Sequence, residues 1–250
     1  MNQDPNSQSD IPFGSSQNDQ AETVHTGFRE VSQEGLSTFI SQVFGWMFAA
    51  LFLTSATSYI VLSNEALLNV AFKYMWPLII LELFAVGFLA IRVHKMSPIT
   101  ATVVFFAYAF CNGFTLTPLI AAYTGESIAG TFMITAGTFG CMSFYGMTTK
   151  KDLTSWGSLL LTALIGIIIA AVVNVFILQS SGFSLVISGI AILVFVGLIA
   201  YDTQMIKSTY QEGMERSAAG HNLAILAALN LYLDFVNLFI HLLQFFGDRE

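Results

Sequence analysis

The segment from Leu223 to Phe246 reads LAILAALNLYLDFVNLFIHLLQFF, and it decides the class of protein to which this chain belongs. As an α-helix it would be about 36 Å long, which exceeds the roughly 30 Å hydrocarbon thickness of a bilayer. Apart from Tyr232 and His241, its one ionisable side chain is Asp234, near the middle. A surface helix of a soluble protein would carry charges along one whole face. The segment is therefore predicted to cross a membrane.

Six further apolar runs precede this one, so the sequence predicts seven transmembrane helices. The runs lie near Phe39–Leu62, Tyr74–Ile91, Pro98–Tyr123, Ile128–Met147, Trp156–Leu178, Phe183–Ile206 and Leu223–Phe246. Only 10% of the residues are charged, whereas soluble proteins carry roughly 25%. The predicted fold class is an all-α membrane protein, a seven-helix transmembrane bundle with a disordered N-terminal tail.

Residues 1–36 form that tail, and residues 37–250 form the membrane domain. The tail is rich in Asn, Gln, Ser and Asp and cannot bury enough apolar surface to offset the entropy lost on ordering. Its six acids against Arg29 account for most of the net charge of −7. No basic stripe appears elsewhere, so nucleic-acid binding is not expected.

The distribution of basic residues predicts a cytoplasmic N-terminus. With that orientation the inner segments collect Arg29, Arg92, Lys95, Lys150, Lys151, Lys207 and Arg216, and the outer ones receive Lys73 and Arg249. The same bias favours an odd number of spans, although the last run could also re-enter the membrane instead of crossing it. The expected location is therefore a membrane, with many passes through the lipid bilayer.

Three acids lie inside predicted spans: Glu82 in the second, Asp202 in the sixth and Asp234 in the seventh. Ionisable groups at membrane depth are costly and mark candidate functional sites. The alternative is that each acid is protonated and serves as hydrogen-bonded glue between helices.

The seventh span also carries a polar stripe that must face protein or water. Its members, at spacings of four, three, four and three residues, are Asn230, Asp234, Asn237, His241 and Gln244. Two interpretations remain open: a polar seam between helices, or the wall of an aqueous or ion pathway. Asn230, Asn237 and His241 are therefore pore-lining candidates, together with Glu82.

A meeting of Asp202 and Asp234 would have a chemical consequence. Two carboxyl groups in a poorly hydrated site would share a proton. Loss of that proton would demand a cation, either Arg92 or a hard metal ion such as Ca²⁺. Contact requires a tilted helix or a sixth helix that continues towards Tyr210, because Asp202 lies nearer the membrane surface than Asp234. We therefore hypothesise a pH switch coupled to cation handling.

Three motifs together resemble the bacterial branch of the Bax inhibitor-1 family, also called the transmembrane Bax-inhibitor-motif family. They are FGCMSFYG (139–146) leading into TKKDL (149–153), AYDTQ (200–204) and LYLDFVNLF (231–239). The resemblance covers about residues 28–247. It implies seven helices and a pH-sensitive calcium leak in the bacterial inner membrane, with Ca²⁺ as a permeant or bound ion and no cofactor.

The resemblance also implies roles for individual residues. Asp202 and Asp234 match a hydrogen-bonded aspartate pair that senses pH, Arg92 matches a latch on the pore, and Glu82 matches an acid along it. Some bacterial relatives are associated with a membrane-bound AAA protease. Binding and regulating such a protease is therefore a competing function.

Two further functions were weighed. An intramembrane aspartyl protease would need Gly-x-Gly-Asp where this chain has LYLD ending at Asp234, and a Pro-Ala-Leu motif that the chain lacks. We therefore do not expect an enzyme. A proton-coupled transporter would also use buried acids, but the sequence shows no paired halves of the kind that build many transporters.

Overall fold

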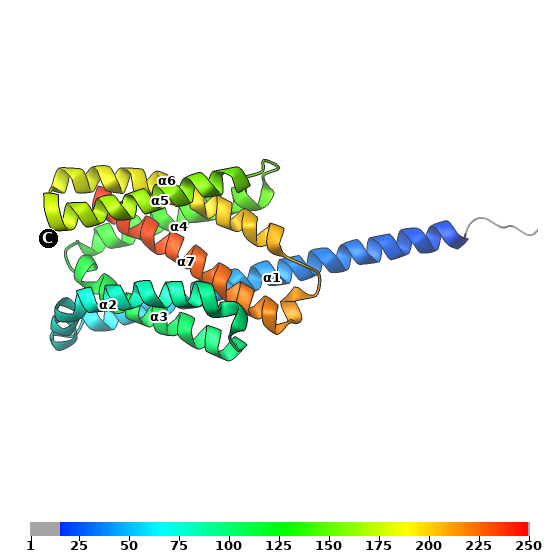
Figure 1. Cartoon of the computed structure of the whole chain (residues 1–250), viewed down its shortest axis with the longest axis horizontal. Coiled ribbons are helices and arrows are strands. Elements are labelled where there is room, and N and C mark those ends of the chain that lie inside the picture. Colours follow the sequence, from blue (N-terminus) through cyan, green and yellow to red (C-terminus); the bar gives the residue numbers. More distant parts are fainter. Residues whose placement is uncertain (1–15, 250) are drawn as a thin grey trace, which may run out of the picture.

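The structure is a computed structural model that describes residues 16–249, and this part of the chain folds into a bundle of long helices (Figure 1). The long helices are α1 (Ser16–Leu62), α2 (Glu65–Arg92), α3 (Pro98–Ile120), α4 (Gly125–Thr148), α5 (Thr154–Val173), α6 (Ser181–Thr209) and α7 (Ala218–Phe246). By length and composition, all seven are able to cross a membrane. The predicted seven-helix fold class is confirmed.

Polar residues in the connections determine where the helices begin. Side-chain oxygens that accept hydrogen bonds from first-turn N–H groups belong to Asn64, Ser97, Thr124, Ser180 and Ser217. The cap at Asn64 lets α2 begin at Glu65, whereas the sequence placed this start near Tyr74. The short turns η1 (Val93–Lys95), η2 (Asn174–Leu178) and η3 (Met214–Arg216) complete the connections.

Helix α1 is longer than the membrane span that it contains. It begins at Ser16, and Figure 1 shows its first turns extending beyond the other helices. Residues 1–15 lie outside the described residues, and the predicted disorder of residues 1–36 stays a prediction. A helix already nucleated in the span propagates at low cost, and residues 16–36 contain no proline to stop it.

Helix α7 occupies the centre of the bundle. It contacts α1, α3, α4 and α6, and 61% of its most apolar stretch is buried, compared with 11% for α2 and for α5. Near its start, the Asn222 amide donates to the carbonyl oxygens of Val93 at 2.9 Å and Met96 at 2.8 Å. At its end, the Thr124 N–H donates to the Asp248 carbonyl oxygen at 3.1 Å. The seventh run is thus one continuous helix from end to end of the bundle, which excludes a re-entrant hairpin.

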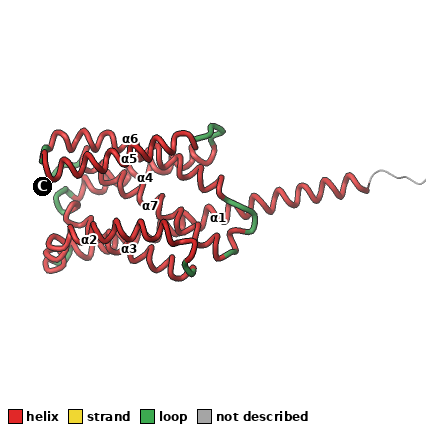
Figure 2. Tube along the Cα trace, in the orientation of Figure 1, coloured by secondary structure: helices red, strands yellow, loops and turns green. Residues whose placement is uncertain are grey.

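The connections alternate between the two ends of the bundle (Figure 2). One end carries the α2–α3, α4–α5 and α6–α7 connections; we call it the basic face. Its basic side chains are Arg92, Lys95, Lys150, Lys151, Lys207 and Arg216. The other end, the opposite face, carries the α3–α4 and α5–α6 connections and the end of α7. The assignment of the basic face to the cytoplasm stays a prediction.

Candidate functional site

The acids of α6 and α7 lie where these two helices pack together. Asp234 is 5% exposed, and its Oδ2 atom accepts no hydrogen bond from an N–H or O–H group in the described part of the chain. The half-buried carboxyl group of Asp202 is its neighbour across the helix contact. Two carboxylate oxygens are both acceptors, so this contact is a hydrogen bond only when one group carries a proton. The sharing of a proton stays a prediction.

A contact between Asp202 and Asp234 was expected to require a tilted helix or a sixth helix that continues towards Tyr210. Helix α6 continues to Thr209, beyond the predicted end at Ile206, and Figure 1 shows α7 running obliquely past it. We call Asp202 and Asp234 together the aspartate centre.

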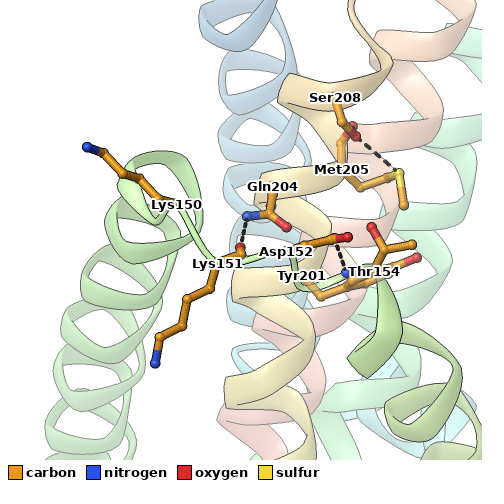
Figure 3. Close-up of a pocket in the computed structure, with 8 residues that line it drawn as sticks. All are labelled: Lys150, Lys151, Asp152, Thr154, Tyr201, Gln204, Met205 and Ser208. Atoms are coloured by element: carbon orange, nitrogen blue, oxygen red, sulfur yellow. Dashed lines mark hydrogen bonds between the residues drawn. The ribbon is translucent and has the colours of Figure 1, made fainter.

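Helix α4 and the α4–α5 connection hold the part of α6 that carries Asp202. Gly146 lies so close to the Ala200 carbonyl that a side chain there would collide with it. The Gln204 side chain accepts from Leu153 N–H at 2.8 Å. It also donates to the Lys151 carbonyl oxygen at 2.8 Å (Figure 3). The FGCMSFYG, TKKDL and AYDTQ motifs thus meet in space and fix the position of the helix that carries Asp202.

The cavity beside this contact measures about 240 Å³ and opens on the basic face. Figure 3 shows the side chains of Lys150 and Lys151 pointing away from α6, so they do not form an anion site within the cavity. Hydrogen bonds from the Thr154 side chain and backbone hold the pKa of the Asp152 carboxyl below its usual value. Asp152 is exposed, which makes it a water-side acid for comparison with the buried pair.

The polar stripe of α7 faces α6 at several positions. Asn230 is exposed into a cavity of about 140 Å³ that Asp202 also lines. Further along, His241 Nδ1 lies 3.4 Å from Ser188 Oγ on α6. Asn237 is half-buried and donates to the Leu233 carbonyl oxygen of its own helix at 2.8 Å. These contacts fit both interpretations that its periodicity allowed, a polar seam between helices and the wall of a pathway, and the pore-lining role stays a prediction.

Glu82 belongs to a separate polar cluster between α2 and α3. It is 8% exposed, and its carboxylate accepts from Thr115 Oγ1 at 2.8 Å and from Asn112 Nδ2 at 3.4 Å. The same Asn112 amide donates to the Tyr108 hydroxyl at 3.4 Å. We call these four residues the glutamate centre.

Tyr232 separates the two centres. Its ring lies 5.9 Å from that of Tyr108, and its hydroxyl is 2.7 Å from Thr54 Oγ1. Residues two positions apart on a helix point to opposite sides, so Tyr232 faces the glutamate centre while Asp234 faces α6. Glu82 and the aspartates are thus not brought together.

The predicted latch is not formed. Arg92 is exposed, and within the described residues the one ion pair joins Arg216 to Glu215. Val93 is bonded to Asn222, which precedes Asp234 by twelve residues, or about 18 Å along the helix. This separation places Asp234 beyond the reach of the Arg92 side chain. The sequence indicated the depth of Arg92 but could not reveal which helix it would adjoin.

The metal-ligand role predicted for Asp202 and Asp234 is weakened. The described residues contain no group of three or more His, Cys, Asp or Glu side chains placed to hold a metal ion. Ca²⁺ takes roughly six to eight oxygen ligands, more than two carboxyl groups provide.

Several supporting residues escaped the sequence reasoning. Ser188, Gln204 and Asn222 each bond a partner more than fifty positions away, and Tyr232 looks like one more aromatic residue in an apolar run. The available signal was modest: a polar side chain within an apolar helix usually has a partner.

These observations define a class of protein: a polytopic α-helical membrane protein with acids buried at its central helix. The comparisons with known proteins specify the family. The family model described as inhibitor of apoptosis-promoting Bax1 matches residues 36–250. The chain therefore belongs to the Bax inhibitor-1 family, as the motifs indicated.

Bacterial relatives are similar over nearly their whole length. The inner membrane protein YbhL of Escherichia coli K12 is 42% identical over 220 residues, covering 86% of this chain and 94% of its own. The uncharacterized protein RP147 of Rickettsia prowazekii is 42% identical over 232 residues, with coverage of 90% and 95%. The chain is thus a multi-pass membrane protein with a relative in a bacterial inner membrane.

Proposed function

We propose that this protein is a pH-sensitive calcium leak channel of the inner membrane, in which the aspartate centre senses pH. The observation that carries the proposal is the buried Oδ2 of Asp234, which has no N–H or O–H donor among the described residues and whose neighbour is the carboxyl of Asp202. A buried acceptor without a donor is costly and requires an explanation. A proton shared with Asp202 supplies one.

The proposed mechanism follows from the charge of the pair. With one shared proton, the two carboxyl groups form a hydrogen bond that holds α6 against α7. Without it, two negative charges face each other in a poorly hydrated site, where repulsion is strong and a cation is the natural partner. The proton therefore determines both the contact between the helices and the affinity of the route for cations.

The experiment is calcium flux into liposomes that contain a trapped calcium indicator, measured over a range of pH. We expect the wild-type flux to change as pH passes through the titration of the pair. Asp202→Asn and Asp234→Asn preserve the shape of the side chains but cannot lose a proton, so their flux should be nearly independent of pH. Asp152→Asn is the matched control, because Asp152 is an exposed acid close to α6. A pH response that survives both buried substitutions would refute the mechanism.

A second candidate, a regulator that binds a membrane-bound AAA protease, is favoured by a different observation. Helix α1 extends beyond the bundle (Figure 1), and an extension of this kind offers a contact for another protein. Removal of residues 1–32 should then abolish co-purification with the protease and leave calcium flux intact. Unchanged co-purification would exclude the extension as the docking element.

A further inference from the structure

Two cavities lie at opposite ends of the α6–α7 contact. The inner cavity, about 140 Å³, is lined by Phe39, Asp202 and Asn230. The outer cavity, about 520 Å³, lies on the opposite face, and its polar lining includes Asn174, Ser184 and Gln244. Both cavities therefore border the same pair of helices, one towards each surface of the membrane.

Polar side chains connect the outer cavity to the aspartates. Ser188 Oγ donates to Gln244 Oε1 at 2.9 Å and lies 3.4 Å from His241 Nδ1. Along α7, Asn237 lies one turn before His241, and Asp234 lies one turn before Asn237. Polar side chains thus recur at each turn of α7 from the outer cavity to the aspartate centre, and we call this row the polar line.

Three side chains pack together at one point of this line. Ser188 is 1% exposed, and the rings of Phe195 and His241 are stacked with centroids 5.9 Å apart. Since Ser188 gives its one proton to Gln244, its oxygen accepts from His241 Nδ1–H. This assignment leaves His241 Nε2 with a free lone pair.

We propose that water and small cations cross along the seam between α6 and α7, and that Ser188, Phe195 and His241 form a second constriction between the outer cavity and the aspartates. The nature of what crosses rests on the proposed leak function. The position of the route rests on the two cavities and the polar line between them. The glutamate centre lies on the other side of α7 and is not part of this route.

The first test measures access to each cavity without measuring flux. Single cysteines are introduced into a background in which Cys111 and Cys141, the chain's two cysteines, are replaced by alanine. A charged, membrane-impermeant methanethiosulfonate is added to one side of sealed vesicles. S184C should react at least tenfold faster from the opposite-face side, and N230C at least tenfold faster from the basic-face side. A228C, at a fully buried core position of α7, should react from neither.

The second test examines the constriction with an ion-sized probe. A thiolate and an imidazole both bind soft divalent metals, so S188C opposite His241 should capture Cd²⁺ added from the outer side. Capture is read as protection of S188C from a maleimide added after solubilisation. The same protection should need at least tenfold more Cd²⁺ when H241A is added. Q244C, which also adjoins Ser188, provides a second position should S188C fold poorly.

The outcomes separate this inference from the leak function. Reaction of S184C and N230C from the same side would overturn the seam as the route. So would a result in which Cd²⁺ protects neither S188C nor Q244C. A protein that leaks calcium yet gives either result carries ions elsewhere. A protein that passes both tests but does not leak calcium has the route and a different permeant.

Discussion

The aspartate centre and the glutamate centre lie on opposite sides of α7 and differ in the hydrogen-bond donors that their buried carboxyl groups have. Glu82 has two hydrogen-bond donors on α3, Thr115 and Asn112, so its carboxylate is bonded within the protein. Asp234 has a buried oxygen without such a donor, and its neighbour is a second acid. The glutamate centre is arranged as a structural joint, and the aspartate centre as a site that needs a proton or a cation.

This difference gives a criterion for choosing among buried acids. Depth in the membrane marks all three as candidates, but a side chain whose bonding is complete has little reason to respond to its surroundings. A side chain whose bonding is incomplete must recruit something from solution. The comparison therefore supports the proposal that the glutamate centre contributes stability and the aspartate centre senses pH, and both roles can be tested.

The largest expected difference is in the pH response of calcium flux. Glu82→Gln retains an oxygen that can accept from Thr115, so we expect the response to remain within about twofold of wild type. Asp234→Asn replaces the titrating carboxyl with an amide that cannot release a proton, so its flux should be nearly independent of pH. Liposome flux at matched pH values measures both. Loss of the response in Glu82→Gln would move the sensor to the glutamate centre.

The next effect concerns how tightly α6 is held beside α4. Gly146→Ala places a methyl group against the Ala200 carbonyl, and overpacking of this kind costs about 1–3 kcal/mol. Gly140→Ala is the matched control on the same helix, because nothing lies within 4 Å of its added carbon. Thermal unfolding of the purified proteins should show a lower midpoint for Gly146→Ala alone. Equal midpoints would mean that the contact does not position Asp202.

Thr115→Val tests whether hydrogen bonds sustain the glutamate centre. It removes the 2.8 Å bond to Glu82 Oε1, and leaving this buried oxygen without its donor, while Asn112 still bonds Oε2, should cost about 1–2 kcal/mol. Thr148→Val is the control, since Thr148 is exposed and bonds the Phe144 carbonyl oxygen of its own helix. A loss of stability is expected in the first variant and little change in the second. If Thr115→Val instead altered the pH response of flux, the division between the two centres would fail.

The seven spans could be predicted from the sequence because lipid leaves a helix as the simplest way to satisfy the backbone. The polar stripe itself was also within reach, since periodicity alone requires His241 and Asp234 to share one side of α7. Asp202 was the nearest acid inside another predicted span, which made its meeting with Asp234 a hypothesis.

The pairing of helices was not within reach. Nothing in the second span indicates that Glu82 would meet Thr115, because which helices adjoin depends on packing between segments far apart in the chain. The same limit applies to Arg92. Its depth in the membrane followed from its position in the second span, but its neighbours depend on how the helices pack. The hydrogen bonds of Gln204 to Leu153 and Lys151 were not predicted, because the sequence showed Gln204 only as part of a motif.

The smallest expected effect lies outside the membrane, at Glu215 on the basic face. The Tyr210 hydroxyl donates to Glu215 Oε2 at 2.8 Å, and this bond is the main reason that the pKa of Glu215 lies below its usual value of 4.5. A lowered pKa in the folded state adds stability above pH 4.5 that is lost as pH falls through the lowered pKa. Tyr210→Phe should therefore lower the melting midpoint slightly at pH 7, and the gap to wild type should narrow as pH falls below 4.5 and through the lowered pKa of Glu215. Melting curves at several pH values measure this. A gap that stayed constant down to pH 3 would show that Tyr210 acts through its ring packing on Phe39, whose centroid lies 5.7 Å away, and not through the charge of Glu215.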